Sequence, residues 1–371
     1  MLAATADAER PWTRAIRRGR VASLHGIGAP GRSDASGRAL PRPASRGDTV
    51  VTFHPDLRAA RFIPNVPASP RIIRAMRRAG ARMQPPPAPD DVRIEEVTVP
   101  GPAGAPDVRV RLYRPVAAPI ATTSADDATA PAPAPALLWI HGGGFVQGSP
   151  IQDEASSIGF VRALGITVAA PTYRLSPDVV APAALEDAYA ALTWLFRNAG
   201  DLGIDAERIA VGGASAGAGL AAGLVLLAHD RGEVRPAFQL LVYPMLDDRT
   251  VVRDDHDTTG VRIWSPALNR YGWTSYLGCE PGGADVSPYA APARRDELAG
   301  LPPAWIGVGT LDLFHDEDVR HAERLNAAGV PTELVLVDGA FHGFDAIFRT
   351  RPVSRAFYEE QVSALRRALL D

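Results

Sequence analysis

The stretch RIAVGGASAGAGLAAGLVLLAH, residues 208–229, decides how this chain is expected to fold. It joins a short apolar run, Arg208 to Val211, to a helical pattern of small and apolar residues, Ser215 to His229. Glycines two positions before and after Ser215 permit a sharp turn between a strand and a helix, which exposes the serine hydroxyl. The alternative is a glycine-rich turn in which Ser215 only caps the helix.

Outside this stretch, apolar runs of strand length alternate with helical patterns. Strands are expected at residues 93–99, 108–112, 136–140, 166–170, 208–211, 238–243, 304–308 and 333–337. Helices are expected at residues 155–164, 182–198, 215–229, 316–328 and 355–370. Strand followed by helix, repeated along the chain, predicts an α/β fold whose mostly parallel sheet is covered by helices on both faces.

The chain before residue 93 differs in composition from the rest. Residues 1–48 are rich in arginine, poor in acids and without apolar periodicity, so we expect a disordered tail. Residues 49–92 hold two short amphipathic helical patterns between Pro55 and Met83, followed by a proline-rich linker. The main domain is expected over residues 93–371, with a flexible loop at Ala117 to Pro135.

Two side chains that follow later predicted strands complete a candidate set with Ser215. Asp312 comes after the strand at 304–308, and His342 comes after the strand at 333–337. The carboxyl ends of parallel strands meet at one edge of a sheet, so we expect these three side chains to lie together. A histidine can accept the proton of a serine hydroxyl, and a carboxylate can fix the orientation of that histidine.

Both candidates have rivals close by in the sequence. Asp316 and Asp318 are acids near Asp312, but they fall inside the following helical pattern, where acids favour the first turn. His315 and His321 are alternatives to His342, and neither follows a strand of its own. Chain order and spacing therefore favour Asp312 and His342.

A second glycine-rich loop follows the predicted strand at 136–140, with the sequence His-Gly-Gly-Gly-Phe at His141 to Phe145. Without side chains, Gly143 and Gly144 leave their backbone N–H groups open to a developing oxyanion, together with the N–H of Ala216. A phosphate-binding loop is the alternative, but no complete phosphate-loop pattern follows the strand. The histidines and the single cysteine show no metal-binding spacing, so neither a metal nor a cofactor is expected.

Composition limits the classes of partner. The formal net charge of the 371 residues is −3, which gives no reason to expect nucleic acid as a partner. No apolar run reaches the roughly 18 residues that cross a bilayer, and the N-terminus lacks the apolar stretch of a secretory signal. Cys279 is the only cysteine and is compatible with a reducing compartment, so a cytoplasmic protein is expected.

Several motifs in this order resemble the bacterial branch of the hormone-sensitive lipase family of α/β-hydrolases. The resemblance covers roughly residues 93–371. It is carried by HGGGF at His141–Phe145, YRLSPD at Tyr173–Asp178, PAALEDAYAAL at Pro182–Leu192, GASAG at Gly213–Gly217, YPMLDDR at Tyr243–Arg249, LDLFHDE at Leu311–Glu317 and FHGF at Phe341–Phe344. It implies an eight-stranded sheet, an N-terminal helical cap, and hydrolysis of short- to medium-chain acyl esters through an acyl-enzyme intermediate without a cofactor.

The matched positions imply roles for individual residues. Ser215, Asp312 and His342 would form the catalytic triad, and Gly143, Gly144 and Ala216 would form the oxyanion hole. Apart from these matched positions, the apolar cap residues Phe62 and Met76 are expected to join Phe145 in lining an apolar acyl or alcohol pocket that binds substrate. The alternative is that these apolar residues face the core. The resemblance also suggests a homodimer that pairs through the predicted strand at 333–337.

Two other functions remain open at this level. The same triad and oxyanion hole serve lactone, amide and carbonate hydrolysis. The family resemblance also covers non-catalytic ligand-binding proteins, which have lost the triad histidine, whereas His342 is present in this chain.

Overall fold

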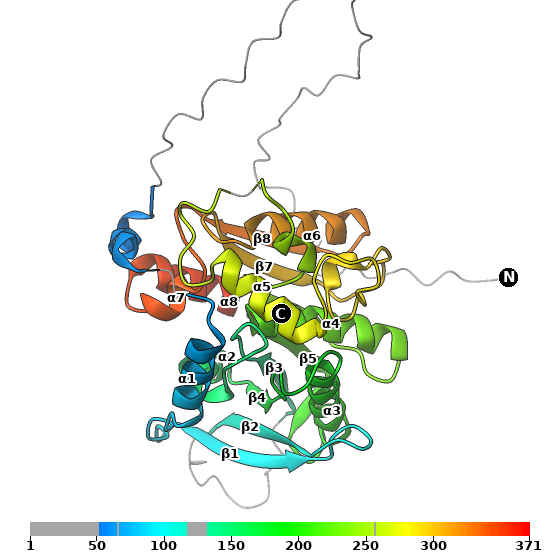
Figure 1. Cartoon of the computed structure of the whole chain (residues 1–371). Helices are drawn as coiled ribbons and strands as arrows, with labels where there is room; N and C mark the ends of the chain where they lie inside the picture. The colour runs from blue at the N-terminus through cyan, green and yellow to red at the C-terminus, as the bar shows by residue number, and fades with distance from the viewer. Residues whose placement is uncertain (1–51, 65–66, 117–131, 256) are drawn as a thin grey trace, which may run out of the picture. The chain divides into compact units, whose positions relative to one another are not determined.

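Eight strands form one sheet at the centre of the protein (Figure 1). Their order is β1-β2-β4-β3-β5-β6-β7-β8. Their bounds are β1 Val92–Val99, β2 Val108–Pro115, β3 Ala134–Ile140, β4 Thr167–Thr172, β5 Ile204–Ala214, β6 Phe238–Val242, β7 Ala304–Gly309 and β8 Thr332–Val337. The computed structural model describes residues 52–64, 67–116, 132–255 and 257–371, so the predicted tail at 1–48 and most of the predicted loop lie outside the described residues.

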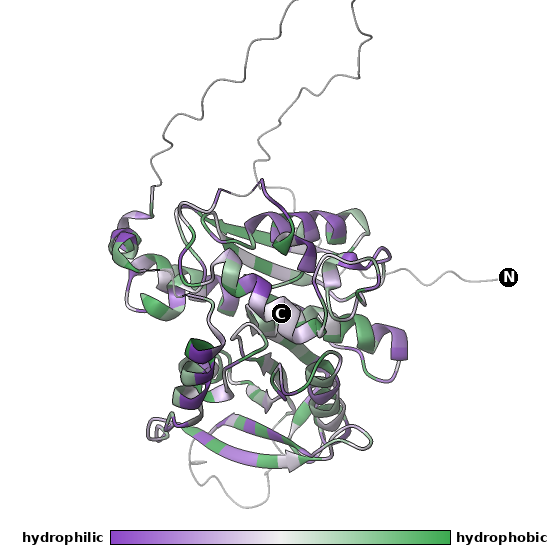
Figure 2. Cartoon of the chain, in the orientation of Figure 1, coloured by the Kyte–Doolittle hydropathy of each residue, from purple (hydrophilic) through white to green (hydrophobic). Residues whose placement is uncertain are grey.

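Strand direction divides the sheet into two parts. β2 is antiparallel to β1 and to β4, and the strands from β4 to β8 are parallel. β1 lies at an edge and alternates in hydropathy, as Figure 2 shows, whereas β6 and β7 are buried along their whole length. This difference follows from the helices that cover both faces of the parallel part. The predicted eight-stranded, mostly parallel sheet is confirmed.

The helices form a layer on each side of the sheet. Their bounds are α1 Pro70–Ala81, α2 Glu154–Leu164, α3 Ala183–Arg197, α4 Ala216–Arg231, α5 Pro266–Leu277, α6 His315–Ala327, α7 Phe344–Ile347 and α8 Pro352–Leu369. Shorter 3-10 helices are η2 Pro55–Phe62, η3 Pro150–Asp153, η4 Asp248–Val251 and η5 Pro292–Arg294. Along β3, Leu138 packs in the core with α3, α4 and α6, and the neighbouring Leu137 packs in the core with α2 and α8.

Helix α4 is buried on nearly all sides, which its small residues make feasible. A Cβ atom built on Gly219 would lie 2.2 Å from the carbonyl oxygen of Met245, and one on Gly223 would lie 2.3 Å from that of Tyr289. Glycine at these positions therefore lets the helix backbone approach its neighbours closely. This close packing holds the start of α4, and with it Ser215, at the carboxyl end of the sheet.

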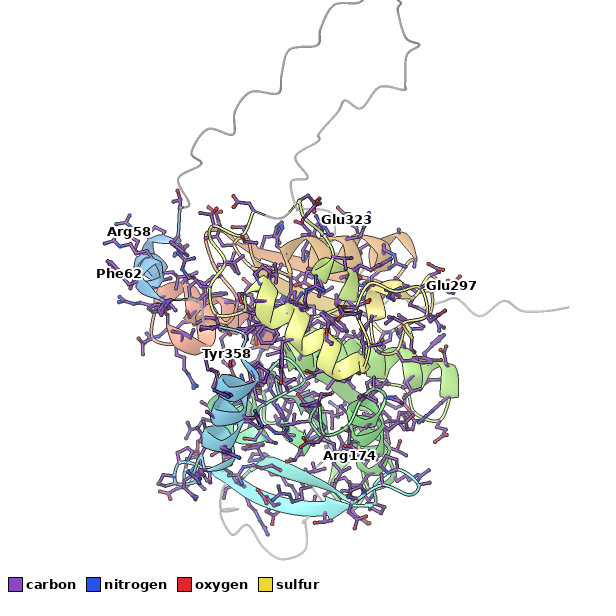
Figure 3. All side chains as sticks on the ribbon, viewed as in Figure 1. Arg58, Phe62, Arg174, Glu297, Glu323 and Tyr358 are labelled. Atoms are coloured by element: carbon purple, nitrogen blue, oxygen red, sulfur yellow. The ribbon has the colours of Figure 1, made fainter. Side chains whose placement is uncertain are left out.

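The N-terminal described segment contains one 3-10 helix and one α-helix where two helices were predicted. η2 contacts the main domain through Leu57, which is fully buried, and through Asp56, which accepts a hydrogen bond from the N–H of Val353. Phe62 is 74% exposed and lies at the periphery in Figure 3, so it is too open to line an enclosed pocket and that prediction is wrong. Met76 on α1 is also exposed. A cap role for residues 49–92 stays a prediction.

Two helices were not predicted. α5 has its signals in the sequence: Ser265 accepts a hydrogen bond from the N–H of Leu268, Pro266 is in the first turn, and Gly278 ends the helix with a positive φ. α7 is four residues long, which gives no helical period to detect. Along the described chain, no helix combines the length and the apolar composition required to cross a bilayer.

Candidate active site

Ser215 lies in a strained turn between β5 and α4. Its backbone angles are φ 57° and ψ −123°, which an L-residue rarely adopts. The turn is fixed by a hydrogen bond from the N–H of Ser215 to the carbonyl of Val242 (2.9 Å) and by two bonds to the Ser215 carbonyl. A Cβ atom on Gly217 would lie 2.1 Å from the carbonyl oxygen of Ile140, and one on Gly213 would lie 2.5 Å from it. The glycines are therefore required by close backbone approach.

The structure brings Ser215, Asp312 and His342 together. Nε2 of His342 is 2.9 Å from the hydroxyl oxygen of Ser215, and Nδ1 is 2.8 Å from a carboxylate oxygen of Asp312. The Ser215 side chain makes no hydrogen bond to the start of α4, so the helix-capping alternative is not what the structure contains. Because Asp312 only accepts when ionised, Nδ1 carries the proton and Nε2 is left to accept the serine proton.

Backbone and aromatic contacts hold this chain of hydrogen bonds. The other oxygen of Asp312 accepts a bond of 3.0 Å from the N–H of Phe314. The His342 ring is contacted edge-on by Phe314 (5.1 Å between centroids) and by Tyr243 (4.8 Å). Ser215, Asp312 and His342 are each less than 10% exposed. The site is thus shielded from bulk water, which strengthens its electrostatic interactions.

Tyr243 opens the YPMLDDR motif, but no role was predicted for it. It follows β6 with a positive φ of 37°, and its hydroxyl donates a hydrogen bond of 2.9 Å to Asp345. The pKa of Tyr243 is raised well above its usual value, chiefly by burial. A tyrosine that packs on the histidine and is itself held by a carboxylate fixes the position of the imidazole ring.

The rival residues are placed elsewhere. Asp316 pairs with His315 and Arg253 on the exposed start of α6. Asp318 is fully buried, and His321 is 3% exposed. Within the described residues, none of the four rival side chains hydrogen bonds to Ser215.

Glu317 has a different role at the start of α6. Its carboxylate accepts hydrogen bonds from the N–H groups of Leu246 (2.7 Å) and Asp247 (3.2 Å) and from the hydroxyl of Thr250. Burial raises the pKa of Glu317 well above its usual value. The side chain ties α6, directly after Asp312, to the loop after β6. Nothing in the LDLFHDE motif indicated that the Glu317 carboxylate would accept hydrogen bonds from the loop after β6.

The glycine loop after β3 lies beside the serine. Gly143 and Gly144 have φ angles of 120° and 60°, and a Cβ atom on Gly142 would lie 3.4 Å from Cβ of Ser215. A Cβ atom on Gly144 would lie 1.9 Å from Cη2 of Trp264. In the part of the chain that the structure describes, the N–H groups of Gly143, Gly144 and Ala216 donate no hydrogen bond. Three adjacent unpaired donors suit an oxyanion.

His141 supports this loop from behind. Its ring stacks on Tyr173 (4.2 Å between centroids), and the Tyr173 hydroxyl donates a hydrogen bond of 2.9 Å to the His141 carbonyl. Nδ1 of His141 is 2.8 Å from the carbonyl oxygen of Gly142. Burial lowers the pKa of His141 to about 4, so the imidazole is neutral near pH 7 and its Nδ1–H donates to that carbonyl.

Phe145 is packed in an aromatic cluster. Its ring stacks on Tyr276 (4.0 Å) and contacts Trp273 (5.4 Å), and its side chain is 1% exposed. A substrate would contact this ring only where the cluster opens toward it, so substrate binding by Phe145 stays a prediction. Trp264 covers the site more directly, because its indole contacts Gly144 and lies 6.5 Å from the His342 ring.

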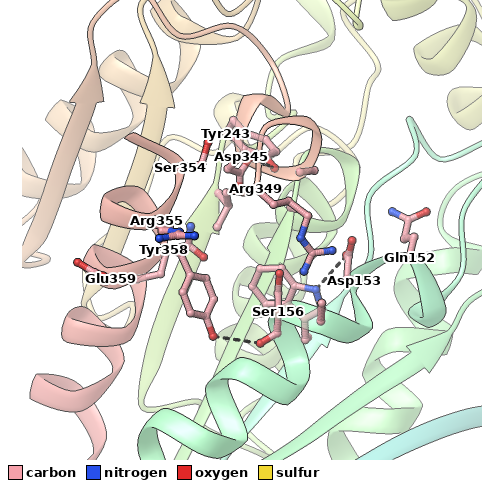
Figure 4. A pocket seen from close by; sticks show the side chains of 16 residues that line it. Gln152, Asp153, Ser156, Tyr243, Asp345, Arg349, Ser354, Arg355, Tyr358 and Glu359 are labelled. Carbon is pink, nitrogen blue, oxygen red and sulfur yellow. Dashed lines mark hydrogen bonds between the residues drawn. The ribbon is translucent and has the colours of Figure 1, made fainter. Parts of the chain in front are cut away.

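A cavity of about 260 Å³ lies beside the site, between α2 and α8 (Figure 4). Ala214, the residue before Ser215, and Tyr243 form part of its wall. Its other lining side chains come from β3, η3, the first turn of α2, β6, α7, the segment after α7 and α8. Elsewhere in the described ranges, no group of three or more His, Cys, Asp or Glu residues is placed to hold a metal ion.

A serine on a strained strand-to-helix turn, joined to a buried histidine and aspartate over a mostly parallel sheet, is the arrangement of a serine hydrolase with the α/β-hydrolase fold. A sequence model of the α/β-hydrolase fold matches residues 137–346. Two proteins of Mycobacterium tuberculosis are each 34% identical to this chain: esterase LipI, over 70% of this chain and 77% of its own length, and carboxylesterase NlhH, over 77% and 86%.

Solved structures agree. A bacterial heroin esterase is 39% identical, with a TM-score of 0.73 over 86% of this chain and 99% of its own. Esterase LipW from Mycobacterium marinum is 34% identical, with a TM-score of 0.71. The chain belongs to the family of hormone-sensitive lipase-like carboxylesterases with the α/β-hydrolase fold. The predicted enzyme class, a carboxylic ester hydrolase, is confirmed.

Proposed function

We propose that Ser215 is the nucleophile of this carboxylesterase, that His342 is its general base and that Asp312 orients the base. The observation that carries this proposal is the continuous chain of two hydrogen bonds, 2.9 Å and 2.8 Å, that joins the three side chains. The strained backbone at Ser215 supports it, because strain of this kind is retained where it presents a reacting group.

The proposed reaction has two steps. Ser215 attacks the ester carbonyl while His342 accepts the hydroxyl proton, and His342 then passes that proton to the departing alcohol. Water, activated by the same histidine, hydrolyses the acyl-enzyme and restores the serine. The N–H groups of Gly143, Gly144 and Ala216 stabilise the oxyanion in both steps, since each is an unpaired donor near Ser215.

The proposed substrates are small-molecule esters with short- to medium-chain acyl groups. Support comes from the crowding around the reacting atoms, where Trp264 covers Gly144 and the Phe145 cluster closes the other side of the loop. A long acyl chain needs a continuous apolar channel, and these aromatic side chains shorten it. No cofactor has a role in this mechanism.

The test is hydrolysis of p-nitrophenyl esters from acetate to palmitate by the wild-type protein and by Ser215→Ala. We expect activity to be highest for short chains and to fall by about 10⁴-fold or more in the variant. Ser287→Ala, an exposed serine replaced in the same way, is the matched control and should keep full activity. Amide or lactone hydrolysis that rivals the ester rate would change the substrate class, and no hydrolysis at all would favour a ligand-binding protein.

Location and assembly are proposals of the same kind. A cytoplasmic location is supported by the exposed free thiol of Cys279, which persists in a reducing compartment. Cell fractionation tests it. A homodimer through β8 is supported by the position of this strand at the sheet edge and by Leu336, which is 47% exposed. Light scattering that shows only monomer would end the dimer proposal.

A further inference from the structure

The cavity between α2 and α8 has no role in the ester hydrolysis proposed at Ser215. It holds about 260 Å³, enough for a small organic molecule, and its walls include side chains of α2 and α8, which cover the same face of the sheet. It lies beyond the triad, since Tyr243 forms its wall on one side and packs against His342 on the other. A ligand in this cavity would therefore lie next to the active site without blocking Ser215.

Two buried hydrogen-bond donors lie on the α8 side of the cavity. Ser354 and Gln361 line the cavity and are each 3% exposed. Within the described residues, the Ser354 hydroxyl and the Gln361 amide nitrogen have no hydrogen-bond partner. Buried donors without partners are costly, so a built binding site explains them better than a surface crevice does.

Two positively charged side chains lie where the cavity opens to solvent. Arg349 and Arg355 line the cavity and are exposed, and neither forms an ion pair with any residue that the structure describes. Figure 4 shows the Arg349 guanidinium reaching across the cavity toward Asp153. Glu359 on α8 is the opposing charge at the rim.

The facing wall has acceptors that are already in use. Asp153 accepts a hydrogen bond of 3.0 Å from the indole N–H of Trp139, and Asp345 accepts the bond from Tyr243. Burial raises the pKa of Asp153 to about 6 and raises that of Asp345. Among the charged and the buried polar side chains of the lining, those without a partner within the described residues are the donors Ser354 and Gln361, the two arginines and the Glu359 carboxylate.

We propose that this cavity binds a small carboxylate, whose oxygens would accept from Ser354 and Gln361 while Arg349 and Arg355 balance its charge. Donors of this kind, combined with arginine, are the usual partners of a carboxylate. The carboxylate has two sources: a free acid, such as the product of ester hydrolysis, or a carboxylate carried by the ester substrate. The second source rests on the proposed function, and the first does not.

The first experiment measures binding of acetate and of succinate to the Ser215→Ala protein by titration calorimetry. We expect saturable binding with affinity reduced about tenfold or more in Gln361→Met, which removes the donor at similar size, and in Arg355→Gln. Arg58→Gln makes the same charge change on the exposed face of η2 and should leave binding unchanged. Circular dichroism checks that each variant is folded, and the exposed arginine variant decides the test if Gln361→Met unfolds.

Three results would overturn the inference: no binding up to about 50 mM of either acid, a concentration above any specific affinity of interest; equal binding in all variants; or equal loss in the Arg58 control.

The second experiment separates the two sources of the carboxylate by comparing hydrolysis of p-nitrophenyl hemisuccinate with that of the uncharged p-nitrophenyl butyrate. If Arg355→Gln lowers kcat/KM for the hemisuccinate alone, the substrate carries the carboxylate. If only calorimetric binding falls, the ligand is a free acid. An enzyme that cleaves neither ester contradicts the proposed function, while the binding data still decide the cavity.

Discussion

Two buried pairs of aspartate and histidine lie near one another in sequence and behave differently. In the first pair, Asp312 and His342, the side chains are joined by a hydrogen bond of 2.8 Å, and the histidine continues to Ser215. In the second pair, Asp318 and His321 on α6, neither Asp318 oxygen nor Nδ1 of His321 has a hydrogen-bond partner within the described residues. The two pairs have the same residue types and similar burial, so they differ in the hydrogen bonds that their side chains make.

Burial without a partner disfavours the charged form of both members of the second pair. The pKa of Asp318 is raised well above its usual value by burial and by the nearby charges of Glu317 and Asp312. The pKa of His321 is lowered to about 4 by burial. An acid and a base whose charged forms are disfavoured, and which share no hydrogen bond, are poorly suited to relay a proton. The comparison shows that a reactive histidine needs a buried carboxylate in contact with it, not only one nearby.

The largest expected effect on activity comes from replacing each of the two histidines in turn. His342→Gln removes the base and should lower kcat/KM for p-nitrophenyl acetate by about 10⁴-fold or more. His321→Gln should change it by less than about threefold, because within the described residues this side chain has no contact with the reacting atoms. Steady-state kinetics on folded protein measure both. Comparable losses in the two variants would contradict the assignment of the base.

Replacing the aspartate of each pair tests the same difference, with a smaller expected effect on kcat. Asp312→Asn keeps the size of the side chain but favours the wrong tautomer of His342, so kcat should fall by about 10²- to 10⁴-fold. Asp318→Asn replaces an acid whose raised pKa disfavours the charged form, and it should leave kcat within about threefold. A large loss in Asp318→Asn with native stability would show that this acid also supports the triad.

The first pair is covered by Trp264, which lies over Gly144 and beside His342. Trp264→Leu should enlarge the space for an acyl chain and raise kcat/KM for octanoate relative to acetate by about tenfold. Trp194→Leu on α3 is the matched control and should leave this ratio unchanged. An unchanged ratio in Trp264→Leu would place the acyl group elsewhere.

The smallest expected effect is on stability. The usual pKa of Asp318 is 3.8, and its folded value is higher, so below that pH both states are protonated and no penalty exists. As pH rises, the unfolded state loses the proton first, which destabilises the folded state. Asp318→Asn removes this penalty. We expect it to raise the free energy of unfolding by about 1 kcal/mol or more near pH 8, with the gain vanishing near pH 4.

Urea unfolding of wild type and Asp318→Asn at the two pH values measures this difference. Asp316→Asn, on the exposed start of α6, is the control, because its pKa is lowered by hydrogen bonding to His315 and by Arg253. Its sign is opposite, so the substitution should reduce stability slightly at pH 8. Equal gains at both pH values in Asp318→Asn would mean that ionisation is not the cause.

Much of the fold was predictable because the pattern of apolar residues within each strand or helix is a local property of the sequence. Most of the strands are short apolar runs, β1 and β2 alternate apolar with polar residues, and α2, α3, α6 and α8 each repeat their apolar residues at helical spacing. α5 was missed because its apolar residues are mostly aromatic and spread around the helix, although Ser265, Pro266 and Gly278 mark its ends. Phe62 was misplaced because an apolar residue at helical spacing does not reveal which surface it meets.

The sequence by itself determined the serine turn, the glycine loop and the order of the candidate acid and base, because each depends on small residues or on neighbours along the chain. Only the tertiary structure decided which aspartate meets which histidine, and that Tyr243 and Trp264 lie against His342. It also placed Ser354 and Gln361 of α8 across a cavity from Asp153 of η3. These contacts join segments of the chain separated by tens of residues or more, and the packing of helices on the sheet sets them, so no local pattern encodes them.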